Sequence, residues 1–281
     1  MVQGYKQHRY FVRRGTRTVP MSEDEVRAAY EAARLRADKL SELLATLPLL
    51  PRIGRNRNTD KMRLIADGLT PPDEWPQVVS VVVAPFDAPP ELASPIQLAD
   101  GFPEEPASRY IAPNRRVLGF APHRLDALGL TAEVLSGDDD AKQVDYRLRL
   151  YRAGVLEWAY RYPIPEPNVI PSTSFAEDVY NVLTYFASIF EGLGYGGRVA
   201  VFVRIDNAEH AVLSINQRLI DWPKQESTGM EMINAYRETT VDALLADPMP
   251  AVRSAMDLIW QAFGYRSCLL FDASGQWRRI S

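Results

Sequence analysis

The stretch that decides the fold is VDYRLRLYRAGVLEWAYRYP, residues 144–163. Apolar and polar residues alternate through its first half, which is the period of a β-strand with two different faces. One face holds Tyr146, Leu148 and Leu150, and the other holds Arg147 and Arg149. The Arg-Ala-Gly step that follows has the composition of a tight turn. We therefore predict a β-hairpin over these residues.

Three aromatic residues of the second strand, Trp158, Tyr160 and Tyr162, share one face of it. Such a face can be a platform on which nucleic-acid bases stack, or it can be a half-buried part of the core. The second interpretation is the more ordinary one, and it is the one we adopt.

The segments around this hairpin carry a mixture of strand and helix signals. Continuous apolar residues at 78–86 predict a strand that is buried on both faces or covered by a helix. Further strands are expected at 198–206 and 211–215, helices at 230–246 and 249–263, and a closing hairpin that joins 267–272 to 276–280. Together these elements predict an α+β fold in which helices cover an antiparallel sheet.

A helix is expected to open at Ser174, because Ser174 and Glu177 have the spacing of a capping box. The residues expected on its buried face are Val179, Val182, Leu183, Phe186, Ile189, Phe190 and Leu193. The glycines of GLGYGG, residues 192–197, follow this helix and precede a strand, which is the reverse of the order in a phosphate-binding loop. We interpret them as the end of the helix and a turn.

The composition excludes several classes of protein. The chain of 281 residues is 46% apolar and 24% charged, as ordinary globular proteins are. No apolar run approaches the roughly 20 residues that span a bilayer, and the first residues lack the pattern of a secretory signal. Cys268 is the only cysteine, so an intrachain disulfide is excluded. We expect a soluble, cytoplasmic protein with no membrane partner.

No set of residues has the spacing of a catalytic or metal centre. The three histidines, His8, His123 and His210, are isolated from one another along the chain. The three adjacent carboxylates of GDDDAK, residues 137–142, lack the alternation of a calcium loop, so we interpret them as a solvated turn. No serine or cysteine lies in a nucleophile motif. We expect no cofactor, no metal and no catalytic activity in this chain.

The charge is distributed unevenly. Residues 1–63 hold 14 Lys or Arg against 7 Asp or Glu, whereas residues 64–281 hold 18 against 29. A basic front followed by an acidic remainder is typical of a protein whose front meets an anionic partner, although a solvated helix can carry basic residues without one. Both interpretations remain open from the sequence.

The N-terminal stretch YFVRRGTRTVPMSEDE, residues 10–25, contains a second hairpin signal. An aromatic strand leads into a turn at Gly15, and Ser22 and Glu25 form a capping box that predicts a helix from Ser22 to Thr46. Apolar residues recur along this helix at spacings of three and four, which predicts an amphipathic stripe that packs against another surface. The residues of this stripe are Val26, Tyr30, Ala33, Ala37, Leu40, Leu44 and Leu47.

This stretch resembles the closing segment of the Schlafen AlbA-type domain, which is found in many bacterial proteins. The positions that match are Tyr10, Phe11, Val12, Arg13, Arg14, Gly15, Thr16, Pro20, Ser22 and Glu25. The resemblance implies nucleic-acid binding, with ATP binding suggested for some members and RNA cleavage for some eukaryotic relatives. It covers only the N-terminal segment, so we expect the body of the domain, with its acidic residues, to be missing from a truncated chain.

These observations predict four regions: a terminal hairpin of the AlbA-type domain at 1–20, a connecting amphipathic helix at 21–47, a proline-rich basic linker at 48–77, and an α+β domain at 78–281. The α+β fold would thus be preceded by a remnant hairpin and a long helix.

The first functional hypothesis is a non-catalytic, nucleic-acid-associated regulatory protein of the Schlafen AlbA type. The residues expected to contact the phosphates of DNA or RNA are Lys6, Arg9, Arg13, Arg14 and Arg17. The amphipathic stripe would make the protein a homo-oligomer. The alternative is a ligand-sensing or oligomerisation module with no nucleic-acid contact, and a third hypothesis is the remnant of a Schlafen-like nuclease.

Overall fold

The computed structural model describes residues 11–14, 17–28, 30–31, 77–86, 92, 123–125, 129–136, 143–161, 169–215, 225–226 and 229–278. The chain divides into two compact units, Met1–Leu49 and Leu50–Ser281, which we describe separately.

The first unit contains the hairpin that the sequence predicts. Strands β1 (Phe11–Arg14) and β2 (Arg17–Pro20) pair antiparallel, with Phe11 opposite Pro20 and Arg14 opposite Arg17. Helical residues follow at 23–28 and 30–31. The helix start near Ser22 is therefore confirmed, whereas the expected course of this helix beyond 31 lies outside the described residues.

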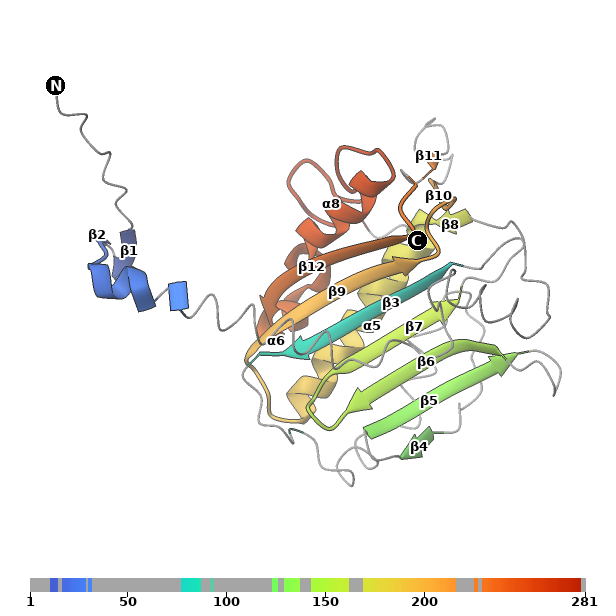
Figure 1. The fold of residues 1–281 in the computed structure, drawn as a ribbon, viewed down its shortest axis with the longest axis horizontal. Coiled ribbons are helices and arrows are strands. Elements are labelled where there is room, and N and C mark those ends of the chain that lie inside the picture. The colour runs from blue at the N-terminus through green and yellow to red at the C-terminus, as the bar shows by residue number, and fades with distance from the viewer. Residues whose placement is uncertain are drawn as a thin grey trace, which may run out of the picture. The chain divides into compact units, whose positions relative to one another are not determined.

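The second unit is built on a seven-stranded sheet with the order β12-β9-β3-β7-β6-β5-β4, in which every neighbouring pair is antiparallel (Figure 1). Its strands are β3 (Val78–Pro85), β4 (His123–Leu125), β5 (Gly129–Ser136), β6 (Gln143–Tyr151), β7 (Leu156–Arg161), β9 (Arg198–Asp206) and β12 (Met232–Thr240). The apolar strand β3 lies at the centre between β7 and β9, and it is buried on both faces as predicted.

The hairpin that decides the fold is confirmed: strands β6 and β7 pair antiparallel. Its turn is closed by hydrogen bonds from the Tyr151 N–H to the Val155 carbonyl and from the Gly154 N–H to the Tyr151 carbonyl, both 2.8 Å long. Trp158 and Tyr160 lie in the core, so the core interpretation of these aromatic residues is confirmed. Tyr162 lies outside the described residues.

A smaller sheet accompanies the large one, with the order β11-β10-β8. Its strands are β8 (Val169–Pro171), β10 (Val212–Ser214) and β11 (Gln225–Glu226). The helices of this unit are α5 (Ser172–Gly192), α6 (Val241–Ala246), α7 (Pro248–Ala251) and α8 (Arg253–Ala262). The expected α+β class, an antiparallel sheet covered by helices, is confirmed.

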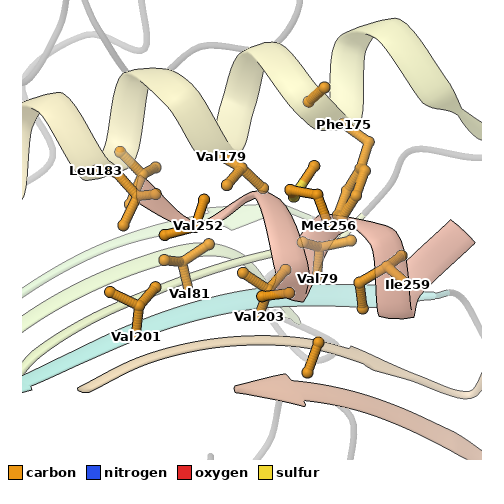
Figure 2. Packing of buried hydrophobic residues seen from close by; sticks show 14 of the residues in the cluster. Val79, Val81, Phe175, Val179, Leu183, Val201, Val203, Val252, Met256 and Ile259 are labelled. Atoms are coloured by element: carbon orange, nitrogen blue, oxygen red, sulfur yellow. The ribbon is translucent and has the colours of Figure 1, made fainter. Parts of the chain in front are cut away.

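The main core lies between one face of the large sheet and the helices α5 and α8. Figure 2 shows side chains of β3 and β9 meeting those of both helices in this layer. The labelled residues are Val79, Val81, Val201 and Val203 from the sheet, Phe175, Val179 and Leu183 from α5, and Val252, Met256 and Ile259 from the α8 region. Helices α5 and α8 thus lie on the same face of the large sheet.

Three sequence predictions were wrong in detail. Residues 232–240 form strand β12 and not the first part of a helix, because all nine pair with β9. Helix α5 begins at Ser172 after an N-cap at Pro171 that makes no side-chain hydrogen bond, so the expected capping box at Ser174 is absent. The closing hairpin forms but its first arm is shorter than expected: Phe271 and Trp277 make an antiparallel bridge, and backbone hydrogen bonds join Asp272 to Gln276 and Arg278 to Leu270.

The glycine-rich segment after α5 was interpreted correctly. Leu193 is the C-cap, and Gly194 follows with φ of +69°, a left-handed conformation that commonly ends a helix. Within the described ranges, the structure contains no helix with the length and apolar character needed to cross a membrane.

Candidate functional site

The basic hairpin of the first unit is the site that the sequence predicts. Its register places Arg14 directly opposite Arg17 and Arg13 opposite Thr18, so three of the five predicted phosphate contacts lie on two adjacent strands. The other two, Lys6 and Arg9, lie outside the described residues. The pairing therefore brings Arg14 and Arg17 to facing positions next to the turn.

The segment after the hairpin is organised by its own local contacts. The Ser22 N–H donates to Glu25 Oε2 at 2.8 Å, and the Glu25 N–H donates to Ser22 Oγ at 3.2 Å. This reciprocal pair is the predicted capping box, which satisfies two N–H groups at the helix start. Glu23 also pairs with Arg27, one helical turn later, at 3.7 Å. Two carboxylates of the acidic run are thus engaged within the first helical turns.

The start of the amphipathic stripe is described at two positions. Val26 is half-buried, and the side chain of Tyr30 is 60% exposed. The remaining residues of the expected interface, Ala33, Ala37, Leu40, Leu44 and Leu47, lie outside the described residues.

A second group of residues lies on the sheet face opposite the helices, which we call the polar face. It comprises Ser80, Thr131, Glu133, Arg147, Arg149, Tyr151, Glu157, Arg204 and Asp206. The strand registers place these residues in cross-strand rows, with Glu133 beside Arg147 and Arg149 beside Glu157. Opposite charges at directly paired positions stabilise an antiparallel sheet.

The alternation of residues 144–150 predicts the correct face for Arg147 and Arg149, but it does not predict their burial. Arg147 is 5% exposed, Arg149 8% and Glu157 5%. Arginine and glutamate are rarely buried unless they are paired. The sequence does contain a signal for this pairing of charges. Counting outward from the turn of the β6–β7 hairpin sets Glu157 opposite Arg149.

The contacts of the polar face join its charges in pairs. Arg147 Nε donates to Glu133 Oε1 at 2.8 Å, and Arg204 Nε donates to Asp206 Oδ1 at 2.7 Å. The Tyr151 hydroxyl donates to Glu157 Oε2 at 2.8 Å. Arg149 lies over the Tyr151 ring, with its guanidinium carbon 4.9 Å from the ring centroid.

Burial controls the protonation of this group. It raises the pKa of Glu157 above the ordinary value of 4.5, although the hydrogen bond from Tyr151 and the charges of Arg147, Arg149 and Arg204 all act to lower it. Burial likewise raises the pKa of Asp206 against the opposing charge of Arg204. The pKa of the Tyr151 phenol is also raised, first by burial and then by Glu157, so this hydroxyl stays protonated and acts as a donor.

This protonation pattern predicts a pH-dependent effect of Glu157→Gln. Because the pKa of Glu157 is raised by folding, the stability linked to its proton is present below about pH 4.5 and is lost as the pH rises through the folded-state pKa. Glutamine stays neutral and keeps an oxygen that can accept from Tyr151. We expect the unfolding free energy of the variant, relative to wild type, to increase as the pH rises above about 4.5 in urea denaturation.

Glu238→Gln is the matched control, since Glu238 also accepts from a tyrosine, Tyr236 at 2.7 Å, but lies exposed on the same sheet. We expect its difference from wild type to change much less with pH. A Glu157→Gln variant that loses stability relative to wild type as the pH rises would show that the three arginines outweigh the cost of burial.

The described residues show no further chemical centre. None of their His, Cys, Asp and Glu side chains form a group of three that could hold a metal ion. His210 is exposed in the turn after β9, and His123 is the first residue of β4. His8 and the acidic segment 137–142 lie outside the described residues. Burial raises the pKa of the Cys268 thiol to about 12, so its thiolate is not formed near neutral pH.

Comparison with known proteins assigns no family. No family model, no curated protein and no solved structure matches the chain. The resemblance of residues 10–25 to the Schlafen AlbA-type segment therefore rests on those residues alone.

Proposed function

We propose that this chain is a non-catalytic, nucleic-acid-associated regulatory protein of the Schlafen AlbA type that holds a DNA or RNA backbone through its basic hairpin. The observation that carries this proposal is the register of the hairpin, which sets Arg14 directly opposite Arg17. We place the protein in the cytoplasm.

The facing positions of Arg14 and Arg17 favour an anionic partner. Like charges at directly opposite positions destabilise an antiparallel pair, and a bound anion removes this cost. The planar guanidinium donates two hydrogen bonds to a phosphate, which makes arginine well suited to this role. Contacts of this kind fix the backbone of a nucleic acid and carry little sequence information. Binding should be non-specific, with a Kd on the order of 10⁻⁴ to 10⁻⁶ M at physiological salt.

The competing interpretation is that the arginines serve only to neutralise the acidic run 23–25. The local contacts weigh against it. Glu23 is paired with Arg27, and Glu25 accepts from the Ser22 N–H, so two of the three carboxylates already have partners within the helix. These contacts leave fewer carboxylate oxygens of the acidic run for the hairpin arginines.

The test is the triple substitution of Arg13, Arg14 and Arg17 by glutamine. We expect weaker retention of both DNA and RNA, because glutamine carries no charge to hold the phosphate that each arginine neutralises. The slope of log K against log salt should become shallower by about 0.9 for each DNA phosphate that the variant no longer neutralises. Fluorescence anisotropy of labelled single- and double-stranded oligonucleotides over a salt series measures both quantities.

A matched control removes the same charge from the second unit. Arg237, Arg266 and Arg278 are all exposed there, and their triple substitution by glutamine should leave both affinity and salt slope close to wild type. Equal weakening in the two triple variants would show that net charge alone is responsible. Unchanged retention in the hairpin variant would remove the hairpin from the function and favour the ligand-sensing alternative.

We also propose that the protein self-associates through the amphipathic stripe. The sequence supports this, because apolar residues recur along the predicted helix at spacings of three and four, and a continuous apolar stripe usually marks an interface.

A further inference from the structure

The polar face holds buried hydrogen-bond donors that have no acceptor among the described residues. They include the hydroxyl of Thr131 on β5 and the Nη1 group of Arg147 on β6. Both residues are almost fully buried, with exposures of 4% and 5%. A buried donor without an acceptor loses its hydration and gains nothing in return, so native proteins rarely leave one unpaired.

The two donors belong to one small part of the sheet. Thr131 is paired with Arg149 and Glu133 with Arg147, so Thr131 and Arg147 are diagonal neighbours on adjacent strands. Diagonal neighbours on the same face of an antiparallel pair lie roughly 7–8 Å apart. A single group with two acceptor oxygens can bridge positions at this separation.

The charge of this part of the sheet selects the kind of acceptor. Glu133 accepts from Nε of Arg147, and Nη1 of the same guanidinium remains without a hydrogen-bond partner in the described part of the chain. Arg149 adds a second positive charge next to Thr131. Donors that include a guanidinium favour a negatively charged acceptor, since charge-assisted hydrogen bonds are the strong ones.

The group borders water on one side. The side chain of Glu133, which accepts from Arg147, is 27% exposed.

We propose that the β5–β6 part of the polar face binds a small oxyanion, namely a carboxylate or phosphate group, with Arg147 Nη1 and the Thr131 hydroxyl as its donors. This site belongs to the second unit and does not depend on the nucleic-acid proposal for the hairpin. It would give the α+β unit a ligand of its own.

The test is thermal unfolding in inorganic phosphate, acetate or chloride at equal ionic strength. A ligand that binds only the folded state raises Tm, by roughly 3–6 °C at a concentration about ten times its Kd in a unit of this size. We expect phosphate or acetate to raise Tm above chloride in wild type, and whichever of them does so identifies the class of oxyanion.

Thr131→Val is the key variant, because it removes the hydroxyl and keeps the shape. We expect it to abolish or strongly reduce the rise in Tm while leaving Tm in chloride unchanged or higher. Arg147→Met should abolish the rise as well, and Thr131→Val keeps the test valid if that variant does not fold. Thr239→Val, on strand β12 of the same sheet, is the matched control and should respond as wild type does.

The Arg13, Arg14 and Arg17 glutamine variant separates this site from the hairpin, and it should keep the full rise in Tm. The proposal is overturned if neither anion raises Tm above chloride. It is equally overturned if Thr131→Val responds as strongly as wild type, since the anion then binds elsewhere.

Discussion

Trp260→Ala is expected to lower the unfolding free energy of the α+β unit by about 3–5 kcal/mol, the usual cost of removing a large aromatic side chain from a core. Trp260 on α8 is fully buried, and its ring lies 5.8 Å from that of Phe175 on α5. The substitution leaves a cavity between the two helices and the sheet, which close packing cannot fill without moving whole elements. Urea denaturation followed by far-UV circular dichroism measures the change.

Leu258→Ala on the same helix is the matched control. The side chain of Leu258 is 50% exposed, so its truncation should change stability by no more than about 0.5 kcal/mol. If the two variants unfold at the same urea concentration, α8 does not pack on the sheet as described.

Gly129→Ala is the second substitution with a large expected effect, a loss of about 3 kcal/mol or more. Gly129 opens β5 with φ of +152°, a conformation that other residues rarely adopt. A Cβ at this position would collide with the Leu150 carbonyl oxygen and lie 2.9 Å from the Tyr151 Cα. Because both are backbone atoms of the paired strand, neither can yield without breaking the β5–β6 pairing. The same denaturation experiment applies.

Gly192→Ala provides the contrast. Gly192 is the last residue of α5, and an added Cβ would meet nothing within 4 Å. Alanine in a helix is favoured over glycine by roughly 0.5–1 kcal/mol, so this variant should be as stable as wild type or slightly more so. A Gly129→Ala protein with wild-type stability would mean that the start of β5 is not held against β6.

Elements specified by neighbouring residues were predictable from the sequence. The capping box of Ser22 and Glu25, the turn at 152–154 and the helix end at Gly194 all depend on groups within a few residues of one another. The alternation in β6 likewise assigned each side chain to its face. In each case the physical cause, whether a cap, a turn or a period of two, is present in the local chain.

Elements specified by distant partners were not predictable in this way. Residues 232–240 suit a helix locally, yet the whole segment pairs with β9, and Thr240 then caps α6 by accepting from the Ala243 N–H at 3.2 Å. Helix α5 begins at Ser172, directly after the short strand β8, rather than at the predicted capping box. Tertiary pairing overrides a local preference because a strand gains a hydrogen-bonded neighbour along its full length.

The two candidate sites, the basic hairpin and the polar face, differ in the same way. The sequence by itself determined the basic hairpin, because its arginines, turn and flanking strands are contiguous. Only the tertiary structure decided that Arg147, Arg149 and Glu157 are buried together. Alternation predicts which face a residue occupies but not whether that face is exposed to water. Burial raises the pKa of Glu157. It also removes the hydration of the donors on Thr131 and Arg147, which have no acceptor among the described residues.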